Sequence, residues 1–196
     1  MSEMQAENTE DYLPERPITV AEYHRMGELG VIKPDDRVEL LDGVLIPMPP
    51  IGPEHGYSVR RLNTNFQRRF GDRASISVQG PITLDDWSEP QPDVMLNSLP
   101  EERYAVANPT VNDSLLVVEV SVTSLADDRG KKLRAYAQCG VREYWLVDVV
   151  HERIEVYREP RGKRFESKRV AGRGDSVAPL AFPDDAIPVD DILPPR

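Results

Sequence analysis

The protein has 196 residues, of which 39% are hydrophobic, and a formal net charge of −10 at pH 7. A chain of this length usually folds as one domain around one core. Its only cysteine, Cys139, excludes an intrachain disulfide, and no apolar run is long enough to span a membrane. The first residues lack the basic and apolar regions of a secretion signal, so we expect a cytoplasmic protein with no membrane partner.

The acidic charge gathers at the two ends of the chain. Residues 1–16 and residues 175–196 each carry five acidic side chains and one arginine. Of the 34 acidic and 24 basic side chains in the sequence, 24 and 22 remain between these ends, a net charge of −2. Basic clusters such as Arg68 and Arg69 lie in this middle part, although most such clusters are simply solvated surfaces. The overall charge therefore does not exclude a nucleic acid partner.

The N-terminal part of the chain predicts a tail followed by a small helix and a hairpin. The acidic residues 1–17 are expected to form a flexible tail, and residues 18–196 a single domain. A capping box, TVAE at 19–22, opens a short helix that ends near Gly30. The Asp-Gly pair at 42–43 stands between two apolar runs, which predicts a two-residue hairpin turn.

A longer helix is predicted from the apolar side chains that recur over residues 54–70. His55 lies one turn before Val59, the first residue of the apolar stripe. Strands are predicted after this helix at residues 74–79, 81–85 and 92–96. Gln79 falls on the polar face of the first of these strands, and Asp93 lies at the start of the last.

A strand, a helix and a second strand follow one another within residues 115–148. The first strand begins with the β-prone run LLVV, so we expect it to be buried on both faces, although Glu119 lies inside it. A buried acid is costly unless it is paired or binds a metal. The helix is predicted over residues 127–139 and the second strand over residues 143–149, which fits a right-handed crossover unit.

Three polar residues of this helix are expected to share one face. Asp128, Lys132 and Tyr136 follow each other at intervals of four residues. Since few residues separate the helix from the strand before it, this face can turn back toward Glu119. Lys131 is rotated by about 100° from Lys132 around the helix and should face elsewhere.

The rest of the chain completes the expected fold. Residues 153–158 and 165–170 are predicted to form a hairpin through residues 159–164, and the acidic, proline-rich residues 175–196 are expected to wrap the surface. The order of elements predicts an α/β (α+β) fold: one mixed β-sheet flanked by helices, with the helix and hairpin as an N-terminal extension.

Two carboxylates on neighbouring strands suggest a metal site. Asp93 and Glu119 could hold Mg²⁺ or Mn²⁺ through hard oxygen ligands, and Lys132 could orient a water molecule or neutralise a phosphate. These are the groups needed to hydrolyse a phosphodiester bond. The spacing alone also fits simpler roles, because Asp93 could cap a turn, Glu119 could pair with a core arginine, and Lys132 could lie on the surface.

Several short motifs together resemble one known family. They are VELLDG at 38–43, PD at 92–93, LVVEV at 116–120, D-x3-K-x3-Y at 128–136 and GVREYWLVD at 140–148. This ordered set resembles the Uma2 family (DUF820), which belongs to the restriction-endonuclease-like PD-(D/E)xK nucleases. The resemblance implies a restriction-endonuclease-like sheet.

The resemblance also implies roles for individual residues. Asp93 and Glu119 would be the metal ligands and Lys132 the catalytic lysine. Two positions depart from the usual pattern: Ser121 stands where the superfamily usually has its lysine, and Val122 stands where the family commonly has a proline. By the same resemblance, Glu39 and His55 are expected to line the site, and Gln79 is added because it lies on the polar face of its strand and could touch metal-bound water.

Three functions remain open at this point. The first is a Mg²⁺- or Mn²⁺-dependent endonuclease with DNA as its partner. The second is a non-catalytic module on the same fold that binds nucleic acid or protein, and the third is an enzyme acting on another phosphate ester. A homodimer is also predicted, because exposed sheet edges need protection and double-strand cutting needs two sites.

Overall fold

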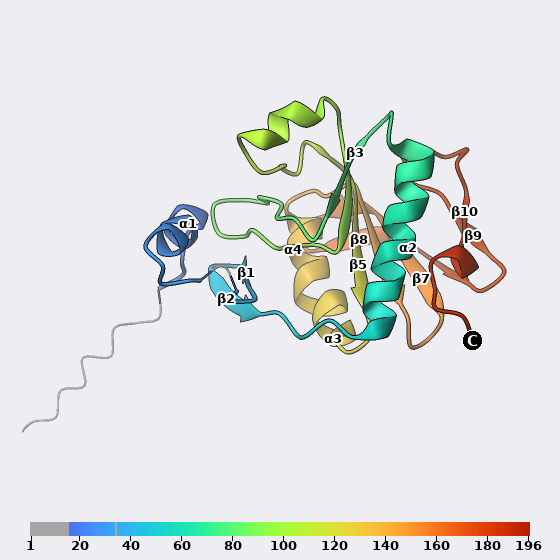
Figure 1. Ribbon diagram of the computed structural model, residues 1–196, viewed down its shortest axis with the longest axis horizontal. Coiled ribbons are helices and arrows are strands. Elements are labelled where there is room, and N and C mark those ends of the chain that lie inside the picture. Colours follow the sequence, from blue (N-terminus) through green and yellow to red (C-terminus); the bar gives the residue numbers. More distant parts are fainter. Residues whose placement is uncertain (1–15, 34) are drawn as a thin grey trace, which may run out of the picture.

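A computed structural model describes residues 16–33 and 35–196. The tail predicted for residues 1–17 thus lies outside the described residues, apart from Arg16 and Pro17. Figure 1 shows helices on both sides of one large sheet and a smaller helix-and-hairpin extension beside it. Within the described ranges, no helix is both long and apolar enough to cross a bilayer.

The main sheet has six strands in the order β3-β4-β5-β6-β7-β8. β5 and β6 are parallel, whereas all other neighbouring strands are antiparallel. The mixed sheet predicted from the sequence is therefore confirmed, and a helical segment joins the parallel pair, as a crossover requires. The strands are β3 (Ser75–Val78), β4 (Val94–Asn97), β5 (Ser114–Ser121), β6 (Glu143–Asp148), β7 (Arg153–Arg161) and β8 (Arg164–Gly172).

Helices cover the two faces of this sheet and create two layers of core (Figure 1). α2 (Pro53–Phe70) buries its predicted apolar stripe on one face. On the other face lie α3 (Leu125–Asp127), a π-helical turn (Asp128–Lys132) and α4 (Leu133–Gln138). We call these three the crossover helix; it packs through Tyr136, which is fully buried. Gly140, at φ 83°, ends it as predicted.

β5 runs through the middle of the sheet and is buried on both faces, as expected. Leu116, Val118 and Val120 point to the α2 side, and Val117 points to the crossover helix. Because strand side chains alternate, Glu119 also points to the crossover helix. This acid is only 3% exposed, so the fold places a carboxylate inside the core.

The N-terminal extension contains the predicted helix and hairpin. In α1 (Val20–Glu28), Thr19 and Glu22 form both hydrogen bonds of the capping box. β1 (Val38–Leu41) and β2 (Val44–Pro47) pair antiparallel through Asp42 and Gly43, whose φ angles are 51° and 75°. Positive φ at both turn positions explains the Asp-Gly pair.

Two predicted elements differ in the structure. Residues 81–85 form no regular strand, only isolated bridges at Thr83 and Asp85. Pro81 has no N–H, and the backbone of the segment bonds to loop residues, as Ile82 N–H does to the Pro90 carbonyl. The crossover helix begins at Leu125, before the predicted start, and contains a π turn with Gly130 at its middle. Glycine favours departure from regular helix geometry, and the contacts described below hold the turn.

The C-terminal part is more ordered than the sequence indicates. β7 and β8 pair as far as Arg161 and Arg164, so the predicted loop over 159–164 shrinks to a tight turn at Gly162 and Lys163. The last residues do not merely wrap the surface. They form β9 (Ser176–Val177), β10 (Ile187–Pro188) and a 3-10 turn (Val189–Asp191), and they bury Ile187, Val189, Ile192 and Leu193 in the α2 side of the core.

Candidate functional site

Glu119 is the centre of a polar cluster under the crossover helix. Lys132 Nζ lies 3.0 Å from Glu119 Oε1, and Tyr136 donates a hydrogen bond of 2.8 Å to the same oxygen. Lys132 Nζ also lies 3.0 Å from Oε1 of Glu39, which comes from β1. One ammonium group thus joins the N-terminal hairpin to the central strand, and the shared face predicted for Lys132 and Tyr136 is confirmed.

Asp93 reaches the same region from the start of β4. Its Oδ2 accepts a hydrogen bond of 2.9 Å from the backbone N–H of Val120 and lies 3.0 Å from His55 Nε2. The sheet register explains this position, because Val94 pairs with Val118 on β5. His55 stands in the first turn of α2, and its Nδ1 has no hydrogen-bond partner among the described residues.

A single cavity of about 200 Å³ connects these groups. Both contacts of Asp93 fall on Oδ2 and both hydrogen bonds to Glu119 fall on Oε1, which leaves the second oxygen of each carboxylate for a ligand. The polar residues that line the cavity include Glu39, His55, Asp93, Glu119, Asp128 and Lys132. We call it the acidic pocket.

The charges in the acidic pocket are strongly coupled. Burial raises the pKa of Glu119 well above its usual value; Lys132 opposes this rise, while Asp128, Asp93 and Glu39 add to it. Burial disfavours the charged form of Lys132, but the carboxylates of Glu119, Glu39 and Asp128 outweigh it and raise the lysine pKa. One ammonium therefore faces an excess of negative charge, a setting in which an additional cation is favoured.

Asp128 contributes a further buried carboxylate from the π turn. Its side chain is held by Ser124 Oγ, which donates a hydrogen bond of 2.5 Å to Oδ2, and Tyr144 donates to its backbone oxygen. Burial raises the pKa of Asp128, although Lys132 and Ser124 counteract part of the rise. The Asp128 side chain lines the pocket together with Lys132 and is not a surface residue.

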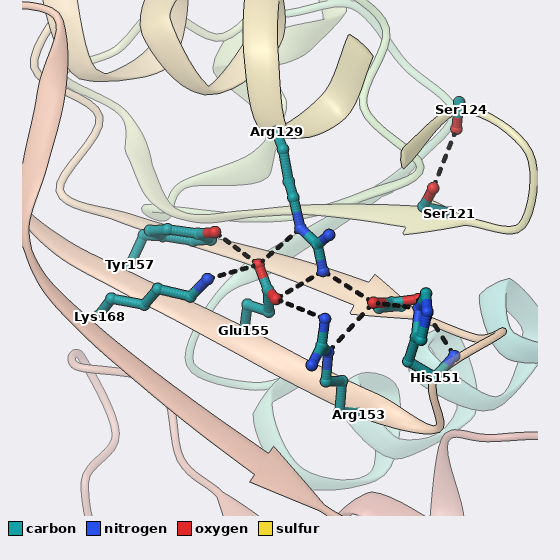
Figure 2. Close-up of polar contacts among 9 residues, drawn as sticks. Ser121, Ser124, Arg129, His151, Arg153, Glu155, Tyr157 and Lys168 are labelled. Carbon is teal, nitrogen blue, oxygen red and sulfur yellow. Dashed lines mark hydrogen bonds and ion pairs between the residues drawn. The ribbon is translucent and has the colours of Figure 1, made fainter. Parts of the chain in front are cut away.

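Arg129, the next residue in the π turn, points the other way into a second charged cluster, which we call the Arg129 network (Figure 2). Its guanidinium donates two hydrogen bonds to Glu155, at 2.7 and 3.1 Å, and one of 2.8 Å to Asp148. Both carboxylates are almost completely buried. The remaining members of the Arg129 network are His151, Arg153, Tyr157 and Lys168.

The Arg129 network fixes the start of the crossover helix on β6 and β7. Sequence patterns did not reveal it, because Asp148 lies at the end of β6 and β7 carries several other charged residues, so neither acid stands out as Glu119 does. Because Asp128 and Arg129 are neighbours that point to opposite sites, the network and the acidic pocket share one turn of backbone. The network therefore holds the turn of backbone that carries Asp128.

Gln79 is not brought into the acidic pocket. β3 ends at Val78, and Gln79 follows it with a φ of 51° and an exposed side chain. It lines a separate hollow together with Arg37 and Gln91. The alternation of side chains along a strand predicts the direction of Gln79 only if the strand continues to this residue. The left-handed backbone at Gln79 ends the alternation. Gln91 is the closer neighbour of the site, since its backbone N–H donates to Glu39 at 3.0 Å.

The donor set decides which metal would fit. No three His, Cys, Asp or Glu side chains in residues 16–33 and 35–196 are arranged so that they could hold a metal together. Asp93 and Glu119 nevertheless present oxygen atoms to the same cavity. Mg²⁺ commonly binds one or two carboxylates and completes its shell with water and phosphate oxygens, so this pair fits Mg²⁺ and not a metal that needs a full protein cage.

Comparison with known proteins identifies the family to which the chain belongs. The model of the Uma2 family, described as "Putative restriction endonuclease", matches residues 20–190. The chain therefore belongs to the Uma2 family. Among solved structures, a "putative nuclease belonging to DUF820" from Anabaena variabilis ATCC 29413 is similar in fold, with a TM-score of 0.69 and 18% identity. That match covers 90% of this chain and 97% of the other. No curated protein matches the sequence.

Proposed function

We propose that this protein is a Mg²⁺-dependent endonuclease, able to use Mn²⁺, that hydrolyses DNA phosphodiester bonds in the acidic pocket. The observation that carries the proposal is the position of Lys132 Nζ, 3.0 Å from both Glu119 and Glu39, in a cavity that Asp93 also lines. Membership of a family described as "Putative restriction endonuclease" supports the reaction type.

Asp93 and Glu119 are the proposed metal ligands. A divalent cation bound there would polarise the phosphate and lower the pKa of a water molecule. The two carboxylates are already held in place for this role: His55 and the Val120 N–H fix Asp93, and Tyr136 fixes Glu119. Fixed ligands need no rearrangement when the substrate arrives, which lowers the barrier.

Lys132 is the proposed catalytic cation. Its side chain is 12% exposed at the edge of the pocket, so its ammonium can approach a phosphate while Glu39 and Glu119 orient it. A fixed positive charge stabilises the negative charge that develops on the phosphate oxygens as the bond to the attacking water forms. Glu39 acts through Lys132 and is a positioning residue.

The decisive experiment compares cleavage of labelled single- and double-stranded DNA with Mg²⁺, with Mn²⁺ and with a chelator. Glu119→Gln keeps the shape and the acceptor for Tyr136 but removes the charge, so we expect cleavage to fall at least about a hundredfold, or about 2.7 kcal/mol of barrier. Glu166→Gln, on exposed β8, is the matched control and should cleave like the parent protein.

Calorimetry with Mn²⁺ gives a second readout that does not depend on turnover. The parent protein should bind Mn²⁺ and Asp93→Asn should bind it more weakly. Equal cleavage by the parent protein and Glu119→Gln would contradict the proposal. DNA binding without any cleavage, in either metal, would instead identify a non-catalytic binding module.

A further inference from the structure

The reactive groups of the acidic pocket are recessed. The side chains of Glu119, Asp93 and Lys132 are only 4%, 11% and 12% exposed, and the cavity that reaches them holds about 200 Å³. This is below the roughly 300–1,000 Å³ of pockets that hold small molecules. A phosphodiester group can enter such a space, whereas a double helix must remain outside.

Stiff walls enclose the pocket on two sides. One wall is the segment between β2 and α2, residues 47–52, which contains Pro47, Pro49 and Pro50. Proline fixes the backbone φ angle, and the segment is anchored by the hydrogen bond of 2.8 Å from Met48 N–H to the Arg37 carbonyl. The other wall is residues 122–124 after β5. The prolines limit how far the first wall can move.

The charges around the opening of the pocket also disfavour a duplex. The residues that line the pocket include more carboxylates than cationic side chains. The cationic side chains are those of Lys132 and Arg37. A duplex carries one negative charge per about 1.7 Å of its axis, twice the density of a single strand. Repulsion by the acidic pocket is therefore stronger for a duplex. The apolar wall of prolines and Ile51, which is 43% exposed, offers contacts that suit unpaired bases and sugars.

We infer that the substrate of this protein is unpaired DNA, a single strand or a locally opened segment, rather than an intact duplex. The inference rests on the proposed function and names its substrate. A single strand is flexible and can bend to bring a phosphodiester group to the pocket, whereas a duplex must first be bent or opened, which costs free energy. The wall formed by residues 47–52 keeps an intact duplex out of the pocket.

The test uses the full chain and one labelled sequence in three forms: a single strand, a blunt duplex, and the same duplex with a central unpaired segment. With Mg²⁺ or Mn²⁺, the single strand and the unpaired segment should be cut at least about tenfold faster than the blunt duplex. In Pro49→Gly/Pro50→Gly the wall is loosened, so the preference for the single strand should shrink. Pro195→Gly, an exposed proline outside the pocket, should keep it.

A measurement of DNA binding tests the substrate inference separately from the proposed function. Glu119→Gln, measured by fluorescence anisotropy, should bind the single strand at least about tenfold more tightly than the duplex, even if no DNA is cut. Absence of cleavage would overturn the proposed function, and the binding preference would then decide the substrate alone. Equal or better cleavage of the blunt duplex, or equal binding of both forms, would overturn the inference.

Discussion

At the scale of single residues, Lys131 and Lys132 form a natural pair for testing the pocket. Lys132 lies between Glu39 and Glu119, whereas Lys131 is 57% exposed and contacts only Asp127, at 3.4 Å, among the described residues. Lys132→Met keeps the length of the side chain but removes its charge. We expect DNA cleavage to fall at least about a hundredfold and Lys131→Met to stay within about twofold of the parent.

Circular dichroism should show the same fold for both lysine variants, because Glu119, whose pKa burial already raises, can take up a proton when the ammonium is removed. Equal loss of cleavage from the two substitutions, with unchanged melting temperatures, would show that Lys132 is not the catalytic lysine.

Glu155 predicts how stability depends on pH. Burial alone would raise its pKa, but hydrogen bonds from Arg129, Tyr157 and Lys168 outweigh burial and lower the pKa from 4.5 to about 2. Because the pKa is lower in the folded state, the ionised carboxylate stabilises the fold above pH 4.5. That contribution, about 3 kcal/mol, is lost as the pH falls from 4.5 through about 2.

Urea unfolding at several pH values measures this effect. The free energy of unfolding of the parent should fall over that acidic range, and Glu155→Gln, already less stable at neutral pH, should fall less steeply. Glu166→Gln is again a matched control. A parallel fall for Glu155→Gln and the parent would show that another acid causes the loss.

At the scale of elements, the crossover helix is held at its start by the Arg129 network. Arg129→Gln leaves Asp148 and Glu155 buried with fewer partners, so we expect a loss of about 3 kcal/mol in the free energy of unfolding. Arg134→Gln, on the exposed side of α4, should change stability by less than about 0.5 kcal/mol.

Arg129→Gln also tests whether Arg129 positions the π turn for catalysis or only stabilises the fold. If Arg129 orients the π turn, Arg129→Gln should lower kcat more than it raises KM, measured well below the melting temperature of the variant, and Arg129→Lys should recover part of kcat. Loss of stability with unchanged kcat would mean that the Arg129 network supports only the fold.

Local patterns explain what the sequence could predict of these elements. β5, α2 and the hairpin at Asp42-Gly43 have clear periodicities or turn residues, so they lie where they were expected. The face shared by Lys132 and Tyr136 follows from helical spacing in the same way. Such patterns carry no information on long-range pairing, and the Arg129 network, which joins the helix to β6 and β7, was missed for that reason.

Other features depend on where an element ends or what lies beside it. Gln79 leaves the site because its strand stops one residue earlier, and residues 81–85 form no strand because they meet their neighbours only through isolated bridges. Ile192 and Leu193 are buried because the end of the chain closes the core beside α2, and the acidic, proline-rich composition of that segment predicts the opposite. Tertiary contacts decide all three of these features.

At the scale of the whole molecule, the homodimer remains a prediction. β3 and β8 are the edges of the six-stranded sheet and could pair with another copy. If the substrate is unpaired DNA, one pocket suffices, so only the exposed edges favour a dimer. We expect light scattering at micromolar concentration to give twice the chain mass of 22.1 kDa. A mass equal to one chain would contradict the dimer.

The contact between Glu39 and Lys132 has a consequence for the newly made protein. The hairpin that carries Glu39 leaves the ribosome before the crossover helix, and Lys132 is added 93 residues after Glu39. At typical translation speeds this interval lasts roughly 5–20 seconds. Asp93 and Glu119 are added within the same interval, so no fragment that ends before Lys132 carries all the proposed reactive groups. If Lys132 is the catalytic lysine, as proposed, a chain whose synthesis stops before it cannot cut DNA, and the order of the residues delays the activity until most of the protein has been made.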